Sequence, residues 1–301
     1  FISRLLPRYR HPQELSQINK RLQEETLVSK TNTSPKISVI TVSYNQGLYL
    51  EKCIQSVINQ RYPNFEYIII DGGSTDESID VIRRYEKHLT YWVSEKDNGQ
   101  SHAFNKGLEK ATGEIIGWIN SDDIYLNNCL IQASEYFASH PRMDIVFSDY
   151  IYIDEHDKFI NFRKEIPFNF EIYRWTEDCY HANCAGFFRK KVFLELGGLD
   201  ESLQNSMDYE FYLRAASRGL EVGHIKACWG AYRLHSQSKS VSQPDLLKHT
   251  VGTIAATFQS QESKVVSRSL KYLYKTIRLC KKIFNGSYFP FSSRKTFDYG
   301  N

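Results

Sequence analysis

The segment Lys36-Ile-Ser-Val-Ile-Thr-Val-Ser-Tyr-Asn45 decides the fold, because an apolar, β-branched run passes directly into polar residues. The composition of Ile37 to Val42 is typical of a buried strand. A helical pattern of apolar residues follows, and Tyr67 to Ile70 then forms a second apolar run; the helical positions are Leu50, Cys53, Ile54, Val57 and Ile58. Strands that alternate with helices predict an α/β fold with a mostly parallel sheet covered on both faces.

Polar side chains stand at the carboxyl ends of the predicted strands, where ligands of such sheets bind. Tyr44 and Asn45 follow the first strand, and Asp71 follows the second, just before a turn that contains two glycines. Within that turn, Ser74 has capping-box spacing to Glu77 at the start of the next helix. One edge of the sheet is therefore expected to collect the polar chemistry.

A third apolar run, Ile115 to Ile119, ends in Asn120-Ser121-Asp122-Asp123. Hard divalent cations prefer carboxylate oxygens, and Mg2+ or Mn2+ is usually shared between a few carboxylates and the phosphates of a substrate. Taken alone, the two acids are more typical of an Asp-rich turn or a helix cap. Their place beside the other strand ends favours a metal-diphosphate site.

The alternation loosens after the acids, which predicts a smaller mixed region. A hairpin is expected from two strand-like runs, and two helices are expected to stop at glycines. The expected elements are strands at Ile145 to Ile153 and Phe159 to Phe162, a helix at Arg189 to Leu196 before Gly197, and a helix at Asp208 to Arg218 before Gly219.

Composition excludes several classes of protein. At 301 residues, with 41% hydrophobic and 24% charged residues, the chain is an ordinary globular protein of one large domain with appendages, or of two small ones. Its apolar runs fall far short of the roughly 20 residues that cross a bilayer. Six scattered cysteines without zinc-site spacing indicate free thiols in a reducing cytoplasm.

The segment from residue 245 onward is basic, with ten Lys or Arg against three Asp or Glu. An apolar stripe recurs at helical spacing, and a basic stripe lies two positions earlier, about 200° around a helix. The apolar stripe is Val266, Leu270, Leu273, Ile277, Cys280 and Phe284; the basic one is Lys264, Arg268, Lys271, Lys275, Arg278 and Lys282. Opposed stripes suit a helix on an anionic membrane, and a helix packed on the main domain with one solvated face is the alternative.

Four motifs, in order and at the right spacing, resemble glycosyltransferase family 2, whose fold is called GT-A. They are Val39-Ile-Thr-Val-Ser-Tyr-Asn45, Asp71-Gly-Gly-Ser-Thr-Asp76, Asn120-Ser-Asp-Asp123 and Met207-Asp-Tyr-Glu210, within a likeness that covers roughly residues 36 to 240. The stretch from Ser94 to Gly107 resembles a further segment of bacterial members. The resemblance implies a metal-dependent, inverting transfer of a sugar from a nucleotide-diphosphate donor, with a UDP-sugar favoured, to the hydroxyl of a saccharide or lipid-linked saccharide in cell-surface polysaccharide or glycolipid assembly.

The resemblance also assigns donor and metal residues. The nucleotide-binding set is Tyr44, Asn45, Asp71, Asp97, Asn105 and Asp122. The Tyr44 ring is expected to stack on the base, and Asp71 to accept a hydrogen bond from a base N–H. Asp123 is expected to hold Mn2+ or Mg2+, with His235 completing the metal or phosphate site. The ion would neutralise the charge that grows on the departing nucleotide.

On the acceptor side, Asp208 matches the family's catalytic aspartate, and Glu210 is the competing candidate. A helix N-cap is the structural alternative for Asp208. Many relatives carry Glu-Asp where this chain has Met207-Asp208, so the role of the first acid is absent here or is supplied elsewhere. The expected acceptor residues are Trp175, His181, Gly186 and Glu210.

The expected organisation has three parts. Residues 1–35 form a helical arm and linker, residues 36–244 form the catalytic domain, and residues 245–301 form the basic amphipathic helical extension. Within the catalytic domain, residues 36–123 bind the nucleotide and residues 124–244 supply the acceptor side and the base. The protein is expected in the cytoplasm, peripherally at the cytoplasmic face of a membrane through its last helix.

Other classes fit the sequence poorly. A Rossmann dehydrogenase needs a G-x-G-x-x-G turn after its first strand, where this chain offers only Gly47. A sugar-1-phosphate nucleotidyltransferase would need a glycine-rich basic loop there. No nucleic-acid partner is expected, since no recognition motif occurs and the chain before residue 245 is net acidic. The alternative that stays open is a degenerate domain that binds a sugar nucleotide or a membrane without catalysis, and the presence of Asp123 and Asp208 argues against it.

Overall fold

The computed structural model describes residues 34–259 and 264–287. The chain divides into two units at Ser34, and the second, Pro35–Asn301, holds every element named below. The helical arm expected within residues 1–35 lies outside the described residues, apart from the last two positions of its linker. Residues 260–263 and 288–301 of the expected extension also lie outside them.

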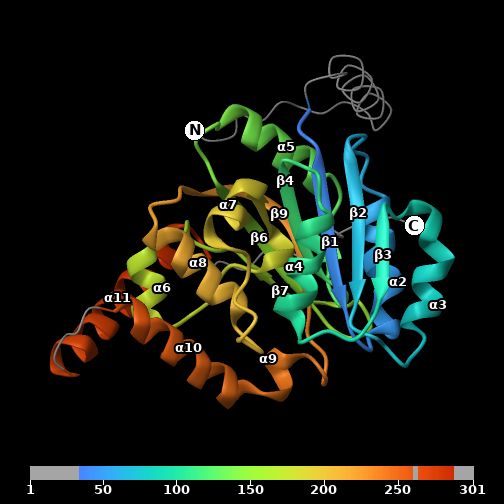
Figure 1. Ribbon diagram of the computed structural model, residues 1–301. Helices are drawn as coiled ribbons and strands as arrows, with labels where there is room; N and C mark the ends of the chain where they lie inside the picture. Colours follow the sequence, from blue (N-terminus) through green and yellow to red (C-terminus); the bar gives the residue numbers. More distant parts are fainter. Residues whose placement is uncertain (1–33, 260–263, 288–301) are drawn as a thin grey trace, which may run out of the picture. The chain divides into compact units, whose positions relative to one another are not determined.

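Strands and helices alternate along the first half of this unit, as predicted (Figure 1). The strands are β1 (Ile37–Ser43), β2 (Phe65–Asp71), β3 (Tyr91–Ser94), β4 (Ile115–Asn120), β5 (Ile124–Tyr125), β6 (Ile145–Ile153), β7 (Phe159–Arg163), β8 (Gly186–Arg189) and β9 (Val222–Arg233). The helices are α2 (Gly47–Ile58), α3 (Ser78–Tyr85), α4 (Gln100–Lys110), α5 (Cys129–Ser139), α6 (Phe170–Thr176), α7 (Lys190–Leu196), α8 (Met207–Ser217), α9 (Lys239–Ser242), α10 (Pro244–Phe258) and α11 (Lys264–Phe284).

The described strands form one sheet in the order β3-β2-β1-β4-β8-β6-β9-β5, with β7 paired to β6. Strands β1 to β4 are parallel, which confirms the prediction for the first half. The predicted hairpin is also confirmed as β6 and β7. The sequence did not predict β8. This strand lies between β4 and β6, is antiparallel to both, and joins the mixed region to the parallel half.

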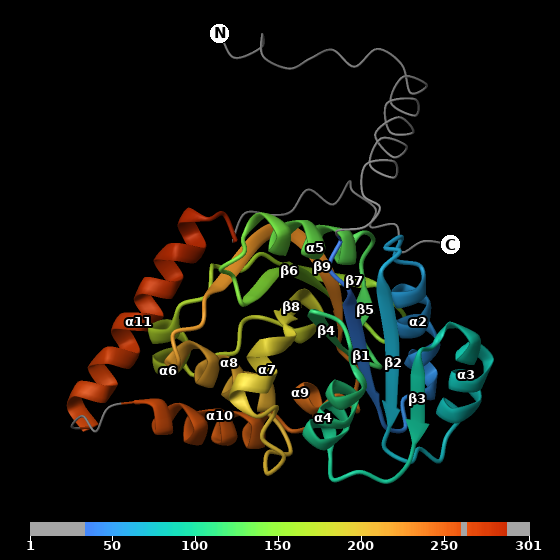
Figure 2. The same cartoon turned by 45° about the horizontal axis from the view of Figure 1, so that its top comes forward.

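Helices cover both faces of the sheet, and each face has its own hydrophobic core (Figure 2). Because successive side chains of a strand point to opposite faces, Ile40 and Val42 of β1 pack with α4, α7, α8 and α10, whereas Ile37 and Val39 pack with α2, α3 and α5. Burial of both faces explains why these strands are continuous apolar runs rather than alternating ones.

The two C-terminal helices, α10 and α11, pack against the rest of the unit that begins at Pro35. Val251, Ile254 and Ala255 of α10 belong to the core shared with α4 and α8. α11 lies against α6 (Figure 1). Among the described residues, no helix is both long and apolar enough to cross a membrane.

The predicted separation of α11 into a basic and an apolar face is wrong in one respect, because half of the basic stripe turns toward the domain. Lys271 pairs with Glu177 and Arg278 with Asp178, and Lys282 Nζ lies 3.1 Å from Glu165 Oε2. Ion pairs with acids of the domain, together with the packing of Tyr274 and Ile277 against its core, therefore hold this side of α11 inward. Outward lie Arg268 and Lys275, together with apolar residues of which Leu273 is 51% and Phe284 89% exposed.

Candidate functional site

The polar residues at the strand ends converge because β1, β2 and β4 are parallel and in close register. Ser43 pairs with Asp71 across β1 and β2, and Val42 pairs with Asn120 across β1 and β4. The residues that follow each strand therefore meet at one edge. This confirms that the edge collects the polar side chains.

Asp71 shapes the turn after β2 rather than facing solvent. Its side chain is fully buried and accepts four hydrogen bonds, from Gly73 N (3.1 Å), Ser74 N (2.8 Å), Ser74 Oγ (2.5 Å) and Ser94 Oγ (2.6 Å). A carboxylate offers about four acceptor positions, so the chain's own donors use all of them. The predicted hydrogen bond from a base N–H is therefore not available in this structure.

Tyr44 is the accessible member of the predicted nucleotide-binding set, with 61% of its surface exposed beside the turn at Gly72. A Cβ atom at Gly72 would lie 3.3 Å from the Tyr44 ring and 2.6 Å from Asp97 Oδ2. Tyr44, the bare backbone of Gly72 and Asp97 thus border one space. Asn45 stands at a left-handed φ of 52° and accepts from Thr75 N through Oδ1 at 2.9 Å, which fixes the loop behind Tyr44.

Gly72→Ala is expected to weaken nucleotide binding about tenfold or more while leaving the fold intact. The added methyl must displace the Asp97 carboxylate and crowd the Tyr44 ring, both of which border the expected base site. Titration of UDP in the presence of Mn2+ measures the effect, and Gly219→Ala serves as a control because no atom lies within 4 Å of its added Cβ, although its φ of +79° adds strain. Equal affinity of Gly72→Ala and wild type would remove this space from the donor site.

The acids after β4 take different positions. Asp122 is the more accessible of the two, with 19% of its side chain exposed, and its Oδ2 lies 3.1 Å from His235 Nε2, although the two residues are 113 positions apart. The His235 ring is held against Tyr49, with 4.5 Å between ring centroids. The structure thus brings together two predicted site residues that lie far apart in the sequence.

Asp123 lies behind this pair and is only 1% exposed. Its Oδ1 accepts from Arg233 N at 3.0 Å, which attaches the acid to the end of β9 just before His235. Oδ2 has no hydrogen-bond partner among the described residues. Burial, and then the charge of Asp122, raise the pKa of Asp123 well above its ordinary value. The geometry therefore gives Asp122, not Asp123, the position that faces a ligand.

The residues present fit a divalent cation that is shared with a substrate. Two adjacent acids, an imidazole and one unpaired carboxylate oxygen meet at the same strand end. In the part of the chain that the structure describes, no three His, Cys, Asp or Glu side chains enclose a metal site by themselves. Mg2+ and Mn2+ commonly take only one or two carboxylates from the protein and the remaining ligands from phosphates and water.

Asp208 lies in the first turn of α8, and its burial raises its pKa above the ordinary value. It is not the N-cap residue, because Ser206 occupies that position with a left-handed φ of 58°. Asp208 Oδ1 accepts from Tyr209 N at 2.8 Å, and Cys179 Sγ lies 3.9 Å from Oδ2. A partly desolvated carboxylate with a raised pKa is a stronger base than an ordinary aspartate.

Glu210 and Asn105 are committed to structural contacts. Glu210 forms a two-point ion pair with Arg214, with N–O distances of 2.8 and 2.9 Å, and Arg214 also donates to carbonyls at the end of α7. Asn105 is bonded to both the N–H and the carbonyl of Leu199, each at 2.9 Å. These contacts engage both side chains in this structure, and the roles predicted for Glu210 as competing base or acceptor residue and for Asn105 as a donor ligand stay predictions.

The remaining predicted acceptor residues lie in the packed interior. Trp175 and His181 are each 2% exposed, and Tyr173 Oη lies 2.7 Å from His181 Nδ1. Burial lowers the pKa of His181 well below its ordinary value. Gly186 belongs to β8, where an added Cβ would lie 2.7 Å from the Phe147 ring. None of the three is accessible to an acceptor in this structure, so their roles stay predictions.

Three residues beside the site had no signal in the sequence motifs. Arg233 is buried and bonds to the carbonyls of Asp122 and Asp154, at 2.7 and 3.0 Å. Cys179 contacts Asp208, and Lys239 of α9 lies within electrostatic reach of Asp208, Asp122 and Asp97. The one signal in the sequence was that Lys239 follows His235 by four positions, which could have indicated that Lys239 lies near this site.

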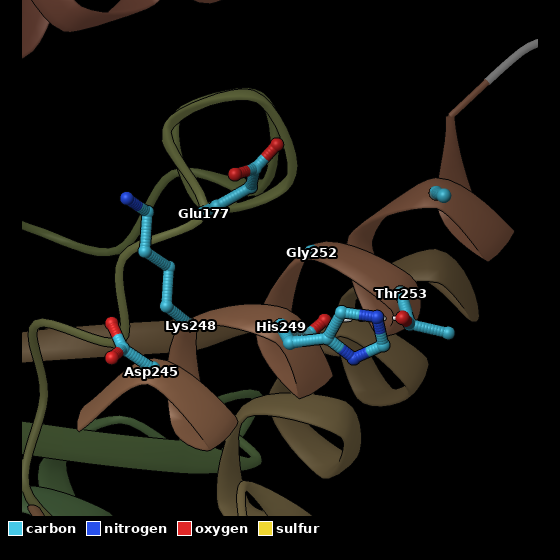
Figure 3. Close-up of a pocket in the computed structure, with 7 residues that line it drawn as sticks. Glu177, Asp245, Lys248, His249, Gly252 and Thr253 are labelled. Atoms are coloured by element: carbon cyan, nitrogen blue, oxygen red, sulfur yellow. Dashed lines mark hydrogen bonds between the residues drawn. The ribbon is translucent and has the colours of Figure 1, made fainter. Parts of the chain in front are cut away.

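A cavity of about 630 Å3 lies along α10, beside the segment that follows α6 (Figure 3). Its lining residues are Glu177, Asp245, Lys248, His249, Gly252, Thr253 and Ala256. No predicted donor or metal residue lines it.

Comparison with known proteins gives a consistent result. The family model described as Glycosyl transferase family 2 matches residues 38–196. The chain is 28% identical, over 231 residues, to a putative teichuronic acid biosynthesis glycosyltransferase of Bacillus subtilis, and the match covers 73% of this chain and 87% of that relative.

Two solved structures are similar in fold. TarS of S. aureus in complex with UDP-GlcNAc has a TM-score of 0.60 at 16% identity, covering 83% of this chain and 73% of that one. The mannosyltransferase PcManGT of Pyrobaculum calidifontis, in complex with GDP-Man and Mn2+, has a TM-score of 0.54 at 17% identity, covering 91% and 94%. At these identities the likeness shows the fold alone, and that fold is the predicted GT-A type.

Proposed function

The chain belongs to glycosyltransferase family 2, and from that premise we propose that it is a metal-dependent, inverting enzyme that moves a sugar from a UDP-sugar to an acceptor hydroxyl. The observation that carries the proposal is the contact of 3.1 Å between Asp122 and His235. Asp208 belongs to the same region, because Lys239 is within electrostatic reach of both Asp122 and Asp208. A site for the diphosphate and a base for the acceptor thus lie side by side.

Asp122 and His235 are the residues that would hold Mn2+ or Mg2+, and this differs from the sequence-based expectation for Asp123. Asp122 is the acid with solvent access, whereas Asp123 joins the strand end to Arg233. When bound, the ion would act as a Lewis acid on the diphosphate and stabilise its growing charge. The mannosyltransferase complex with GDP-Man and Mn2+ supports a bound metal in this fold and does not distinguish Asp122 from Asp123.

Asp208 serves as the general base. Transfer with inversion needs a single attack from the side of the sugar ring opposite the leaving group, so the base must stand across the site from the diphosphate. Asp208 takes the acceptor's proton, and its raised pKa favours that role at neutral pH. Glu210 is occupied by Arg214, so it does not compete.

The donor's base and the acceptor class rest on the comparisons and on Tyr44. Tyr44 offers an exposed ring for stacking, with Asp97 beside it. The TarS complex with UDP-GlcNAc favours UDP over GDP, though PcManGT carries GDP-Man. The relative named for teichuronic acid biosynthesis supports a saccharide or lipid-linked saccharide acceptor in cell-surface polysaccharide or glycolipid assembly.

The proposal is tested by a donor screen in which UDP-, GDP- and dTDP-sugars are added with and without Mn2+ and the thermal midpoint is recorded. A ligand at 100 times its dissociation constant stabilises a protein by about 2.7 kcal/mol, enough for a clear shift. We expect a shift with UDP-sugars that depends on Mn2+. Should a donor stabilise the protein while no nucleotide is ever released, the alternative of a catalytically degenerate binding module would replace the enzyme.

We further propose that α11 lies on the anionic cytoplasmic face of a membrane, close to a lipid-linked acceptor. Its outward side carries apolar residues that are 41% to 89% exposed, among them Val266, Tyr272, Leu273, Leu279, Ile283 and Phe284. Arg268, Lys275 and Lys281 are exposed on the same helix. An apolar side flanked by cations matches the surface of an anionic bilayer.

The full chain is expected to co-sediment with vesicles of anionic lipid and much less with zwitterionic ones. Replacing Leu279, Ile283 and Phe284 together by Gln should reduce partitioning about tenfold or more, since each loses apolar contact with lipid. A matched triple replacement of Thr250, Thr253 and Thr257 on α10 by Gln is the control. Equal partitioning of wild type and the α11 variant would contradict the membrane role.

A further inference from the structure

Lys239 is a cation placed among acids without an ion-pair partner. Within the described residues it forms no salt bridge shorter than 4 Å, and its ammonium donates one hydrogen bond, to the carbonyl of Gln204 at 2.7 Å. An ammonium has three N–H donors, so two stay available. A surface lysine without a function would normally extend into solvent, whereas this one donates to the loop before α8.

The surrounding loops hold Lys239 in place. Gln204 Nε2 donates to the Asn98 carbonyl at 3.3 Å, and a Cβ at Gly99 would lie 2.8 Å from Gln204 Oε1. Gly99 N in turn donates to Asp97 Oδ1 at 2.8 Å. The start of α9, the loop before α8 and the loop before α4 are therefore linked through one short series of contacts.

Three acids act on this ammonium from different elements. Although the residue is exposed as a whole, desolvation lowers the pKa of Lys239, and Asp208, Asp122 and Asp97 act in the opposite direction. Lys239 is therefore within electrostatic reach of the proposed base and of the proposed metal acid. The anomeric carbon of the sugar must lie near Asp208, and the diphosphate must lie near Asp122. The phosphate that is bonded to the sugar is therefore expected between these two acids.

Charge balance also calls for a cation here. A departing nucleoside diphosphate carries more negative charge than the donor, and the site already contains several acids. Arg233 is occupied by backbone carbonyls and Asp157, and His235 faces Asp122. Among the described side chains that surround Asp122 and Asp208, Lys239 is the one with a cation that no acid already pairs. A fixed ammonium is a good ligand for a phosphate oxygen.

Building on the proposed function, we propose that Lys239 binds the β-phosphate of the donor and stabilises the nucleoside diphosphate as it leaves. In this role it would complement a divalent ion held by Asp122 and His235. The acceptor oxygen bonds to the anomeric carbon and gives its proton to Asp208, while the bond from that carbon to the β-phosphate oxygen breaks. The electron pair of the broken bond stays on the phosphate, and Lys239 keeps its proton throughout.

The test measures UDP and UMP binding, with Mn2+ present, to wild type, Lys239→Gln and Lys239→Arg, with Lys226→Gln as the control for loss of an exposed lysine on β9. Lys239→Gln is expected to lose UDP affinity about 10- to 100-fold, the usual size for a charge-assisted hydrogen bond, and UMP affinity less than about threefold. Lys239→Arg should recover part of the loss, and Lys226→Gln should match wild type.

Equal losses for UMP and UDP would overturn the assignment, because a purely structural role would affect both ligands alike. UDP affinity unchanged in Lys239→Gln would overturn it as well. Failure of the proposed function would give a different result: the wild-type protein would bind neither UDP nor GDP in the presence of Mn2+. In that case the assignment of Lys239 would be wrong as well.

Discussion

Asp208→Asn is expected to abolish sugar transfer while donor binding stays within about twofold of wild type. General base catalysis typically contributes a factor of about 10² to 10⁴, and an amide cannot take up the acceptor's proton. The replacement has nearly the same shape, and its oxygen can still accept from Tyr209 N, so α8 should keep its start. Turnover with a saturating acceptor and titration with UDP separate the two effects.

The matched control is Glu210→Gln, which removes the other acid of the same helical turn. It breaks the pair with Arg214 and is expected to lower stability modestly while turnover persists. If Glu210→Gln lost transfer and Asp208→Asn did not, the assignment of the base would be reversed.

The pH profile gives an independent check on Asp208. Because burial raises its pKa, the carboxyl takes up a proton at a higher pH than an ordinary aspartate, whose pKa is about 3.9. Only the deprotonated form is a base, so kcat/KM should fall as the pH drops through that raised value. An acid limb at the ordinary aspartate pKa would argue against the desolvated environment.

Asp122→Asn and Asp123→Asn are expected to differ strongly. Asp122 is partly exposed and contacts His235. Loss of its charge should reduce Mn2+-dependent UDP affinity about 100-fold or more, because a Lewis-acid ion contributes several kcal/mol. Asp123→Asn keeps an oxygen for Arg233 N and should cost about tenfold or less. Binding is measured over a range of Mn2+ concentrations.

The pair of variants also decides between the two assignments of the metal ligand. The sequence motif favours Asp123, and burial favours Asp122. If Asp123→Asn lost metal-dependent binding while Asp122→Asn kept it, the motif-based assignment would stand, and the unpaired Oδ2 of Asp123 would be the ligand atom.

The fold could be predicted wherever local pattern determines structure. Apolar runs of strand length, helical spacing between them and the polar residues at their ends were sufficient for the parallel half. The insertion of β8 between β4 and β6 could not be predicted, because strand order depends on packing between distant segments. Ser74 shows the same limit locally, since its hydroxyl bonds Asp71 instead of capping α3.

The site was predictable to the extent that motifs end strands or begin helices, as at Asp122 and Asp208. Trp175, His181 and Asn105 have suitable chemistry, but tertiary packing has buried or paired them, and one sequence does not reveal that. The orientation of α11 failed for a related reason. Its periodicity located two stripes correctly, while ion pairs with acids elsewhere in the chain and packing against the core hold one side inward.

The central claim is that this chain catalyses metal-dependent transfer from a sugar nucleotide bound at Asp122 and His235. Its most direct test is nucleotide release from the donor that the thermal screen identifies, measured with Mn2+, after removal of the metal by EDTA and after its restoration. The account predicts release that stops with EDTA, returns with Mn2+ and is absent in Asp122→Asn. Release at the same rate without metal, or in Asp122→Asn, would contradict it.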